Sequence, residues 1–330
     1  MKSLLSILWA SSLLYGAPQD GIDDGDNSQM PEIAAFDPLI VQQPISSDAI
    51  QFPDPFIEPR RKSPFLAVGL SALFPGLGHA YLGDLKTAGG LGGTAGLGIG
   101  LVSSSSNEAV VTNSLVSLQT TWSYGIYAAY RDVRLFNGNA GYSYKMPNDS
   151  FADLSFAPFR WRVLKKPEVW GGFLGALALV AGTGYAIQKT AHIQPRLSSG
   201  FDKLSPLIAF PIGLGEESLF RGFLQSQLAE TFTPWGGIVL SSLAFGAMHI
   251  PNALLLEPED RMGYYTFSLP LITTLGAYFG WVTYKNHSLQ ESVALHSWYD
   301  FAIFAAGALA SQTAAAGYSG DFRFALAIPF

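Results

Sequence analysis

Two adjacent glutamates, Glu216 and Glu217, and an arginine, Arg221, lie inside an otherwise apolar run of the sequence. A charged side chain at the depth of a bilayer costs several kcal/mol, roughly 2.5–3.5 on insertion scales, so charges in such a place indicate a functional site. If the run is helical, residues four apart share a face, and Glu217 can pair with Arg221. Glu216 then points elsewhere and is the carboxylate left free for chemistry.

Two polar motifs in later apolar segments each supply a histidine. Phe245 and His249 are four residues apart, as are His296 and Asp300, so on helices each pair shares a face. A lone histidine here is more often a core residue hydrogen-bonded to a neighbouring helix, and Asp300 could simply fix the tautomer of its partner ring. Two such histidines after paired glutamates, out of five in the chain, favour a common site.

Composition indicates a membrane protein. Of the 330 residues 48% are hydrophobic and 13% charged, about half the charged fraction of a typical soluble domain. The net charge of −6 comes largely from a polar stretch near the N-terminus, so no nucleic-acid partner is expected. The chain has no cysteine, which excludes disulfides, thiol catalysis and cysteine-containing metal sites.

The first part of the chain has the pattern of an exported segment. Residues 1–17 have a basic start, an apolar run and a small-residue end, as in a secretory signal peptide or an uncleaved signal anchor. Residues 18–62 are rich in Asp, Pro, Gln and Ser without helical or alternating periodicity, which predicts a disordered exported segment.

Residues 63–130 are expected to form an N-terminal three-helix membrane region, with segments at about 64–82, 87–104 and 112–130. The second segment repeats glycine at four-residue spacing, a pattern that lets helix backbones approach closely. These glycines are Gly89, Gly93, Gly92, Gly96 and Gly100.

Residues 131–167 form a basic loop, which the positive-inside rule places in the cytoplasm. Its seven basic residues are Arg131, Arg134, Lys145, Arg160, Arg162, Lys165 and Lys166. Counting back three spans puts residues 18–62 outside, in agreement with export. The basic cluster at 60–62 lies on the opposite side from the one that the rule predicts.

Residues 168–310 contain the motifs, and residues 311–330 form a C-terminal tail. The expected membrane segments of this part are Trp170–Ile187, 204–228, 236–255, 267–284 and 289–310. The sequence therefore predicts an all-α fold, a polytopic membrane helical bundle of about seven to eight transmembrane helices.

The motifs resemble the CPBP family of intramembrane proteases, which includes type II CAAX prenyl endopeptidases and bacteriocin-immunity-type (Abi) proteins. That family carries E-E-x-x-x-R, F-x-x-x-H and H-x-x-x-N on successive membrane helices. The resemblance covers about 168–310 and implies an intramembrane endopeptidase, of the metalloprotease type if a metal is bound. The residues that it assigns to the site are Glu216, Glu217, Arg221, His249, His296 and Asp300.

The resemblance implies that Glu216 and His249 activate a water for attack on a peptide bond. His296 would help to hold a metal ion or stabilise the oxyanion of the tetrahedral intermediate. Arg221 would neutralise Glu217, so that two adjacent carboxylates are not both unpaired at low dielectric.

Asp300 stands where many family members have asparagine. An ionised aspartate accepts hydrogen bonds but cannot donate one to an oxyanion. With Glu216, His249 and His296 it makes a plausible zinc set of nitrogen and oxygen ligands. The same four side chains serve a mechanism with or without Zn²⁺, and the sequence leaves that choice open.

The remaining notable residues have simpler expectations. Trp298 and Tyr299 are expected to pack or to line the pocket. The other histidines, His79, His192 and His287, fall at predicted segment ends or in loops and are expected to be ordinary interfacial residues.

Two other classes of protein use similar residues. A catalytically silent scaffold or immunity-type protein would keep the fold for binding, and the intact motifs count against it. A proton-coupled transporter would use the intramembrane carboxylates and histidines as a relay, but the sequence has no repeat of broken helices. We expect a multi-pass protein of the bacterial inner membrane that acts on a membrane-associated peptide or protein, without the prenyl group of the family name.

Overall fold

The computed structural model of the chain describes residues 61–190, 206–256 and 258–315. Within these ranges every regular element is a helix, so the all-α prediction is confirmed for the described residues. The predicted signal-like segment and nearly all of the exported segment lie outside them, as does His192.

The first predicted membrane segment, 64–82, is two helices, α2 (Pro64–Leu73) and α3 (Leu77–Leu82), so the prediction of one continuous span is wrong. The chain breaks at Pro75 and at Gly76, whose φ is 95°. A Cβ on this glycine would lie 2.4 Å from a backbone oxygen, so the turn requires glycine. The ten residues of α2 extend about 15 Å, about half of the ~30 Å hydrocarbon core.

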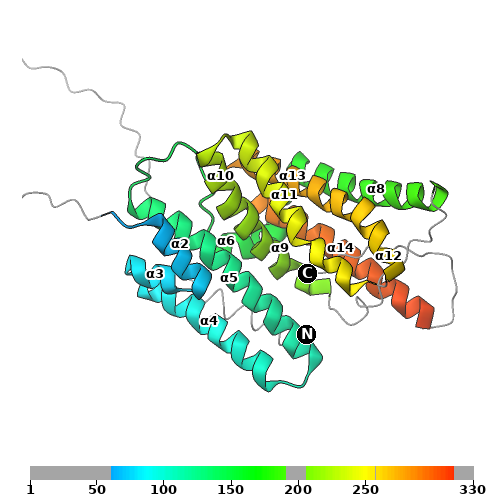
Figure 1. Ribbon diagram of the computed structural model, residues 1–330, viewed down its shortest axis with the longest axis horizontal. Helices are drawn as coiled ribbons and strands as arrows, with labels where there is room; N and C mark the ends of the chain where they lie inside the picture. Colours follow the sequence, from blue (N-terminus) through cyan, green and yellow to red (C-terminus); the bar gives the residue numbers. More distant parts are fainter. Residues whose placement is uncertain (1–60, 191–205, 257, 316–330) are drawn as a thin grey trace, which may run out of the picture. The chain divides into compact units, whose positions relative to one another are not determined.

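The next two helices, α4 (Leu85–Ser104) and α5 (Glu108–Phe136), lie side by side (Figure 1). The buried residues of α4 are Leu91, Ala95 and Gly98, at the spacing of one helix face. Four of the five glycines at four-residue spacing would meet no atom within 4 Å if they carried a Cβ: Gly89, Gly93, Gly96 and Gly100. Within the described part of the chain, the predicted close approach is therefore wrong for these four glycines.

The predicted basic loop, 131–167, begins inside α5 and ends where α8 (Pro167–Thr190) begins. It contains three short helical elements: α6 (Phe151–Phe156), η2 (Ala157–Phe159) and α7 (Trp161–Leu164). They pack on one another and on α14, described below, so much of this segment is ordered structure against the core.

The motif-bearing part contains one long helical run, which is followed by six further helical elements among the described residues. The run is η4 (Pro206–Ile208), α9 (Ala209–Glu217), η5 (Ser218–Gln225) and α10 (Ser226–Thr231). After it come α11 (Pro234–Met248), η6 (Ile250–Leu255), α12 (Pro258–Gly263), η7 (Tyr264–Ser268), α13 (Leu269–Asn286) and α14 (Gln290–Ala315).

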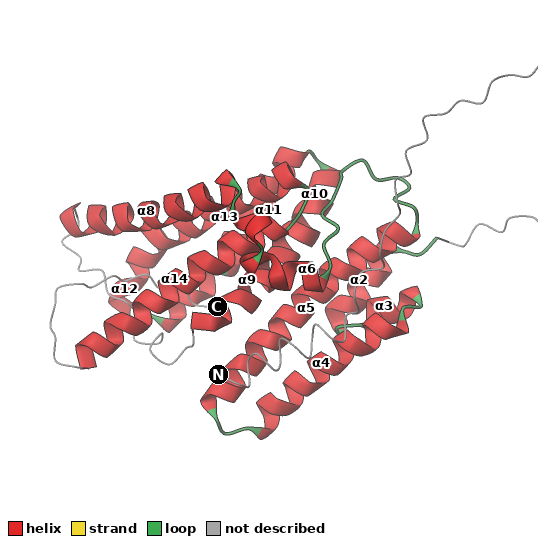
Figure 2. Cartoon of the chain, turned by 180° about the vertical axis from the view of Figure 1, so that it is seen from behind, coloured by secondary structure: helices red, strands yellow, loops and turns green. Residues whose placement is uncertain are grey.

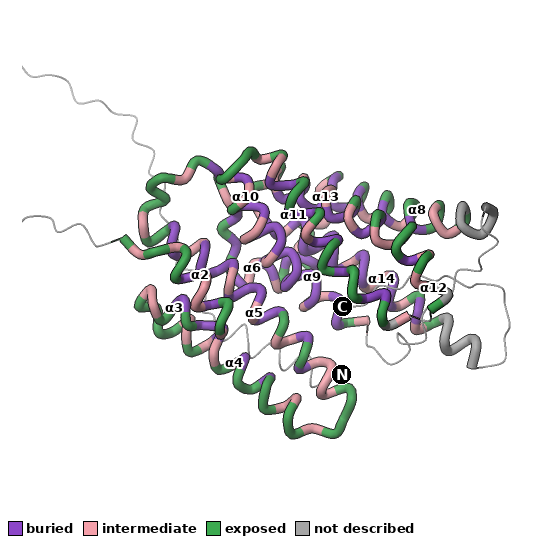
Figure 3. Tube along the Cα trace, in the orientation of Figure 1, coloured by how far each residue is buried: buried purple, intermediate pink, exposed green. Residues whose placement is uncertain are grey.

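Helix α9 is central, because it packs against both α14 and α5 and so joins the motif-bearing helices to the N-terminal ones. Helix α11 lies against α13, and α8 lies against α14 and α13 (Figures 1 and 2). Figure 3 shows buried positions gathered around α9, which packs against both α5 and α14. The paired glutamates on α9 and the third motif on α14 therefore lie in an enclosed part of the bundle.

Among the described residues, one helical stretch, Pro234–Leu254, is long and apolar enough by length and composition to cross a membrane, and half of its apolar window is buried inside the protein. Large apolar side chains also face outward on several helices, among them Leu97, Leu174, Leu243 and Leu309. The count of seven to eight spans stays a prediction.

Candidate active site

All six residues that the sequence assigns to the site are buried. Glu216 and Glu217 end α9, and Arg221 follows in η5, so one helical run carries the first motif. His249 directly follows α11, while the third motif lies in the second turn of α14 and the turn after it. Each of the six is at most 9% exposed: Glu216, Glu217, Arg221, His249, His296 and Asp300.

The predicted pair of Glu217 and Arg221 is present. Arg221 Nη1 lies 3.0 Å from Glu217 Oε1, and both side chains are fully buried. The other terminal nitrogen of the guanidinium, Nη2, donates to the carbonyl oxygen of Gly276 at 3.0 Å. The guanidinium carbon lies 4.2 Å from the ring centroid of Phe245, within the range of a cation–π contact. Phe245 of the second motif therefore helps to hold the arginine of the first.

Glu217 has a second partner that sequence reasoning did not identify. His296 Nδ1 lies 2.8 Å from the same Oε1 of Glu217. Because a carboxylate only accepts, Nδ1 carries the proton, and the ring is fixed with Nε2 on its other side. The partners are 79 positions apart in the chain, so no local spacing rule could have predicted this contact.

The free nitrogen side of His296 faces two more carboxylates. Its Nε2 lies 3.4 Å from Asp300 Oδ2 and 3.7 Å from Glu216 Oε2. The second distance is too long for a direct hydrogen bond, but a water could join the two groups. The Glu216 side chain is 11% exposed, whereas that of Glu217 is 0% exposed. The predicted difference between the two glutamates is thus visible in both contacts and access.

His249 is fixed at the end of α11. Its Nδ1 lies 2.7 Å from the carbonyl oxygen of Phe245, which can only accept, so Nδ1 carries the proton and Nε2 is free. The hydroxyl of Tyr264 donates to the backbone oxygen of His249 at 2.8 Å. The ring of Phe245, one helical turn before His249, lies 6.0 Å from the ring of His296, centroid to centroid. The structure therefore brings the second motif to the first and third.

The helix after the glutamates is not α-helical as the sequence analysis assumes. Residues Ser218–Gln225 form a π-helix, a rare form that is frequent at functional sites. Within it Gln225 is fully buried and donates from Nε2 to the carbonyl oxygen of Gly280 at 2.9 Å. A Cβ on Gly280 would lie 2.6 Å from Gln225 Oε1. Gln225 was missed from the sequence, and its only signal is its place four residues after Arg221.

The zinc set predicted from the sequence does not appear as a metal-binding group. Among the described residues, no three or more His, Asp and Glu side chains form a group that could hold a metal ion. The contacts of His296 instead pair its two nitrogens with different carboxylates. We therefore derive no step through a metal.

The other predicted residues have mixed outcomes. Trp298 packs rather than lines a pocket, because its Nε1 donates to the carbonyl oxygen of Pro158 at 2.8 Å. Tyr299 is 5% exposed in an apolar cluster. His287 is exposed at the end of α13, as expected. His79 is fully buried, so the expectation of an interfacial residue is wrong for it.

Comparison with known proteins supports the family suggested by the motifs. The family model described as type II CAAX prenyl endopeptidase Rce1-like matches residues 204–302, under a third of the chain. The resemblance stated from the sequence is confirmed over these residues, which include all six predicted site residues. No curated protein and no solved structure shows a significant match to the chain.

Proposed function

From the premise that residues 204–302 belong to the Rce1-like family of type II CAAX prenyl endopeptidases, we propose that this chain is a membrane endopeptidase. Its substrate is a membrane-associated peptide or protein, and its reaction is hydrolysis of a peptide bond by water. The expected location is a bacterial inner membrane, crossed several times by the chain, where no prenyl group is required of the substrate.

One observation carries the proposal: a partly accessible carboxylate, Glu216, lies 3.7 Å from a histidine nitrogen whose ring is held by a separate buried ion pair. A general base must lie near the proton that it removes and have a defined orientation. Glu217 and Arg221 fix the orientation of His296. Glu216 and the Nε2 atom of His296 therefore remain free to bind a water.

Each side chain of the site has a role in the proposed reaction. Glu216 takes a proton from the water, whose oxygen attacks the carbonyl carbon of the scissile bond. The Nε2 of His249 or that of His296, once it carries a proton, can donate to the oxyanion that forms. The proton held by Glu216 then passes to the leaving nitrogen as the carbon–nitrogen bond breaks. Water is consumed, and one carboxylate and one amine are released.

Zinc binding by Glu216, His249, His296 and Asp300 stays a prediction from the sequence. The steps above use only the chain's own side chains. Metal content is therefore measured beside the rate in the Asp300 variant described in the Discussion.

A proteomic comparison tests the proposed function. Membrane fractions are compared from cells that express the wild-type protein, Glu216→Gln, or Glu230→Gln as a matched control outside the site. Glu230 lies in α10 and binds the backbone of Ser143 and Tyr144. We expect new protein termini with the wild type and with Glu230→Gln, and none with Glu216→Gln. Identical termini in all three samples would contradict hydrolysis and favour a silent scaffold.

A further inference from the structure

The first turn of α14 is held by residues that precede the family-matched part of the chain. Asp149 is 7% exposed, and its Oδ2 accepts from the backbone nitrogen of Leu289 at 2.7 Å. Its Oδ1 accepts from Ser288 Oγ at 3.0 Å and from Gln290 Nε2 at 2.8 Å. One carboxylate therefore binds three consecutive residues where α14 begins.

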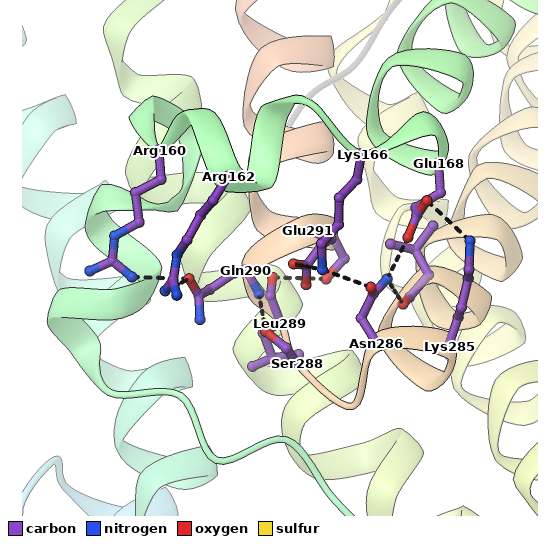
Figure 4. A network of polar contacts seen from close by, with 12 residues as sticks. Arg160, Arg162, Lys166, Glu168, Lys285, Asn286, Ser288, Leu289, Gln290 and Glu291 are labelled. Carbon is purple, nitrogen blue, oxygen red and sulfur yellow. Dashed lines mark hydrogen bonds and ion pairs between the residues drawn. The ribbon is translucent and has the colours of Figure 1, made fainter. Parts of the chain in front are cut away.

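Further contacts join the same turn to the segment around α7 (Figure 4). Arg160 Nη1 and Arg162 Nη2 both donate to Gln290 Oε1, at 3.0 and 2.9 Å. Lys166 Nζ lies 2.6 Å from Glu291 Oε1 and donates to Asn286 Oδ1 at 2.9 Å. We call Asp149, Arg160, Arg162 and Lys166 the α14 clamp.

The physical reason for such a contact lies in the helix terminus. The first backbone N–H groups of a helix have no partner inside it, and a carboxylate at this end also interacts favourably with the helix dipole. Ser288 caps the nitrogen of Gln290 at 3.1 Å. The nitrogen of Leu289 is bound by Asp149, which is 140 residues away in the chain.

Asp149 is itself fixed to α5. Its backbone nitrogen donates to the hydroxyl of Tyr127 at 3.0 Å, and its backbone oxygen accepts from Arg131 Nη1 at 2.5 Å. Helix α5 in turn packs against α9, which carries the paired glutamates. Asp149 therefore connects the start of α14 to α5, the helix that also packs against the glutamate-bearing α9.

The site depends on this alignment. His296 is six residues into α14, about 9 Å along its axis. A helix transmits a shift of its first turn along its length, and the bond between His296 Nδ1 and Glu217 is only 2.8 Å long. A misplacement of about 1 Å can cost on the order of 100-fold in rate.

We propose that Asp149, with the rest of the clamp, is a positioning residue that sets His296 against Glu217. The proposal rests on the proposed function and deepens it, because it extends the working unit beyond residues 204–302 to a segment that the family model does not include.

Glu230 provides a matched control for a merely structural role. Its carboxylate also accepts three hydrogen bonds, from Ser143 N at 2.7 Å, Ser143 Oγ at 3.0 Å and Tyr144 N at 2.8 Å. It ties the same connecting segment to α10, however, and among the described residues it has no hydrogen bond or ion pair with α14. Loss of either carboxylate removes three hydrogen bonds, but only Asp149 binds the start of the helix that carries His296.

The experiment compares wild type, Asp149→Ala, Asp149→Asn and Glu230→Ala as full-length proteins in detergent. Hydrogen exchange is measured over residues 289–300, and kcat and KM on a fluorogenic peptide that spans a cleavage site found in the proteomic comparison. For Asp149→Ala we expect about tenfold faster exchange and a kcat about tenfold lower with KM changed less than about twofold. Asp149→Asn, which keeps one acceptor oxygen, should fall between, and Glu230→Ala should match the wild type in both.

Several outcomes would overturn the proposal. Unchanged exchange over residues 289–300, or an equal loss of kcat in Asp149→Ala and Glu230→Ala, would mean that the clamp supports the fold but does not position His296. If Asp149→Ala does not fold, Asp149→Asn and Gln290→Ala supply the same comparison. A wild type without peptidase activity would contradict the proposed function alone, and exchange would still decide whether the clamp holds α14.

Discussion

Two regions of the molecule place the same three kinds of side chain in contact: a histidine, a carboxylate and an arginine. In the N-terminal helices, His79 Nε2 lies 3.1 Å from Asp132 Oδ2, and Arg131 Nε lies 2.7 Å from the other carboxylate oxygen. The second ring nitrogen of His79, Nδ1, is buried without a hydrogen-bond partner among the described residues. On the histidine side this set ends at Asp132, whereas Arg131 also donates to the backbone oxygen of Asp149.

In the core, Glu217 joins His296 to Arg221, but the set continues. The second nitrogen of His296 faces Asp300 and the partly accessible Glu216. The comparison shows that a histidine, a carboxylate and an arginine in contact can be a structural unit by themselves. In the core set, a further carboxylate, Glu216, lies beside the second histidine nitrogen, and its side chain is 11% exposed. This addition makes the core set a candidate site for catalysis of hydrolysis.

The largest expected effect separates the two regions by activity. Glu216→Gln should lower the peptidase rate by about 10²–10⁴-fold, the usual contribution of a general base, without lowering abundance. Asp132→Asn, which changes the carboxylate of the N-terminal set, should keep a rate near that of the wild type. Rates of the purified proteins and immunoblots of membranes check both. Comparable rate losses would mean that the two sets do not differ in function.

The next effect is on stability. Arg221→Ala strands the fully buried Glu217, which should destabilise the protein by about 3–5 kcal/mol. Arg131→Ala should cost less, because the Asp132 side chain is 27% exposed and water can solvate it. Thermal melting in detergent measures the two losses. If Glu216→Gln lowered abundance as much as Arg221→Ala, the paired glutamates would be purely structural.

Asp300 tests how far the core set extends. An asparagine keeps the size and one acceptor oxygen of Asp300, and no metal-binding group appears among the described residues. We therefore expect Asp300→Asn to retain at least about a tenth of the rate, since an amide oxygen can still accept a hydrogen bond. Zinc is measured in the same samples by mass spectrometry. A sharp fall in both zinc content and rate would instead support the zinc set predicted from the sequence.

The smallest effect concerns pH and the N-terminal set. Burial raises the pKa of Asp132, but hydrogen bonds with His79 and Arg131 outweigh it and lower the pKa from 3.8 to about 2. A lowered carboxyl pKa stabilises the fold above the ordinary value, and this stability is lost as the pH falls toward 2. The melting temperatures of wild type and Asp132→Asn should differ by the same few degrees at pH 7 and pH 5, and converge near pH 2. A difference that persists there would assign the effect to packing.

What could be predicted from the sequence rests on short spacings. The pair of Glu217 and Arg221 follows from helical geometry, because residues four apart meet on one face whatever the rest of the chain does. The helical class likewise follows from long apolar segments, and the family from the order of three motifs within one part of the chain. The break at Pro75 and Gly76 was not predicted, although proline and glycine together mark a turn.

Only the tertiary structure decided which distant groups meet. The bond of Glu217 to His296 and that of Asp149 to Leu289 each join segments far apart in the chain, and their partners depend on how helices pack rather than on spacing. The packing of α4 likewise could not be predicted. The glycine repeat shows that another helix can approach this face closely, but it does not show which helix does so. Glu216 was predicted to be free because Glu217 has a local partner, but only the packing of α9 against α14 brings it within 3.7 Å of His296.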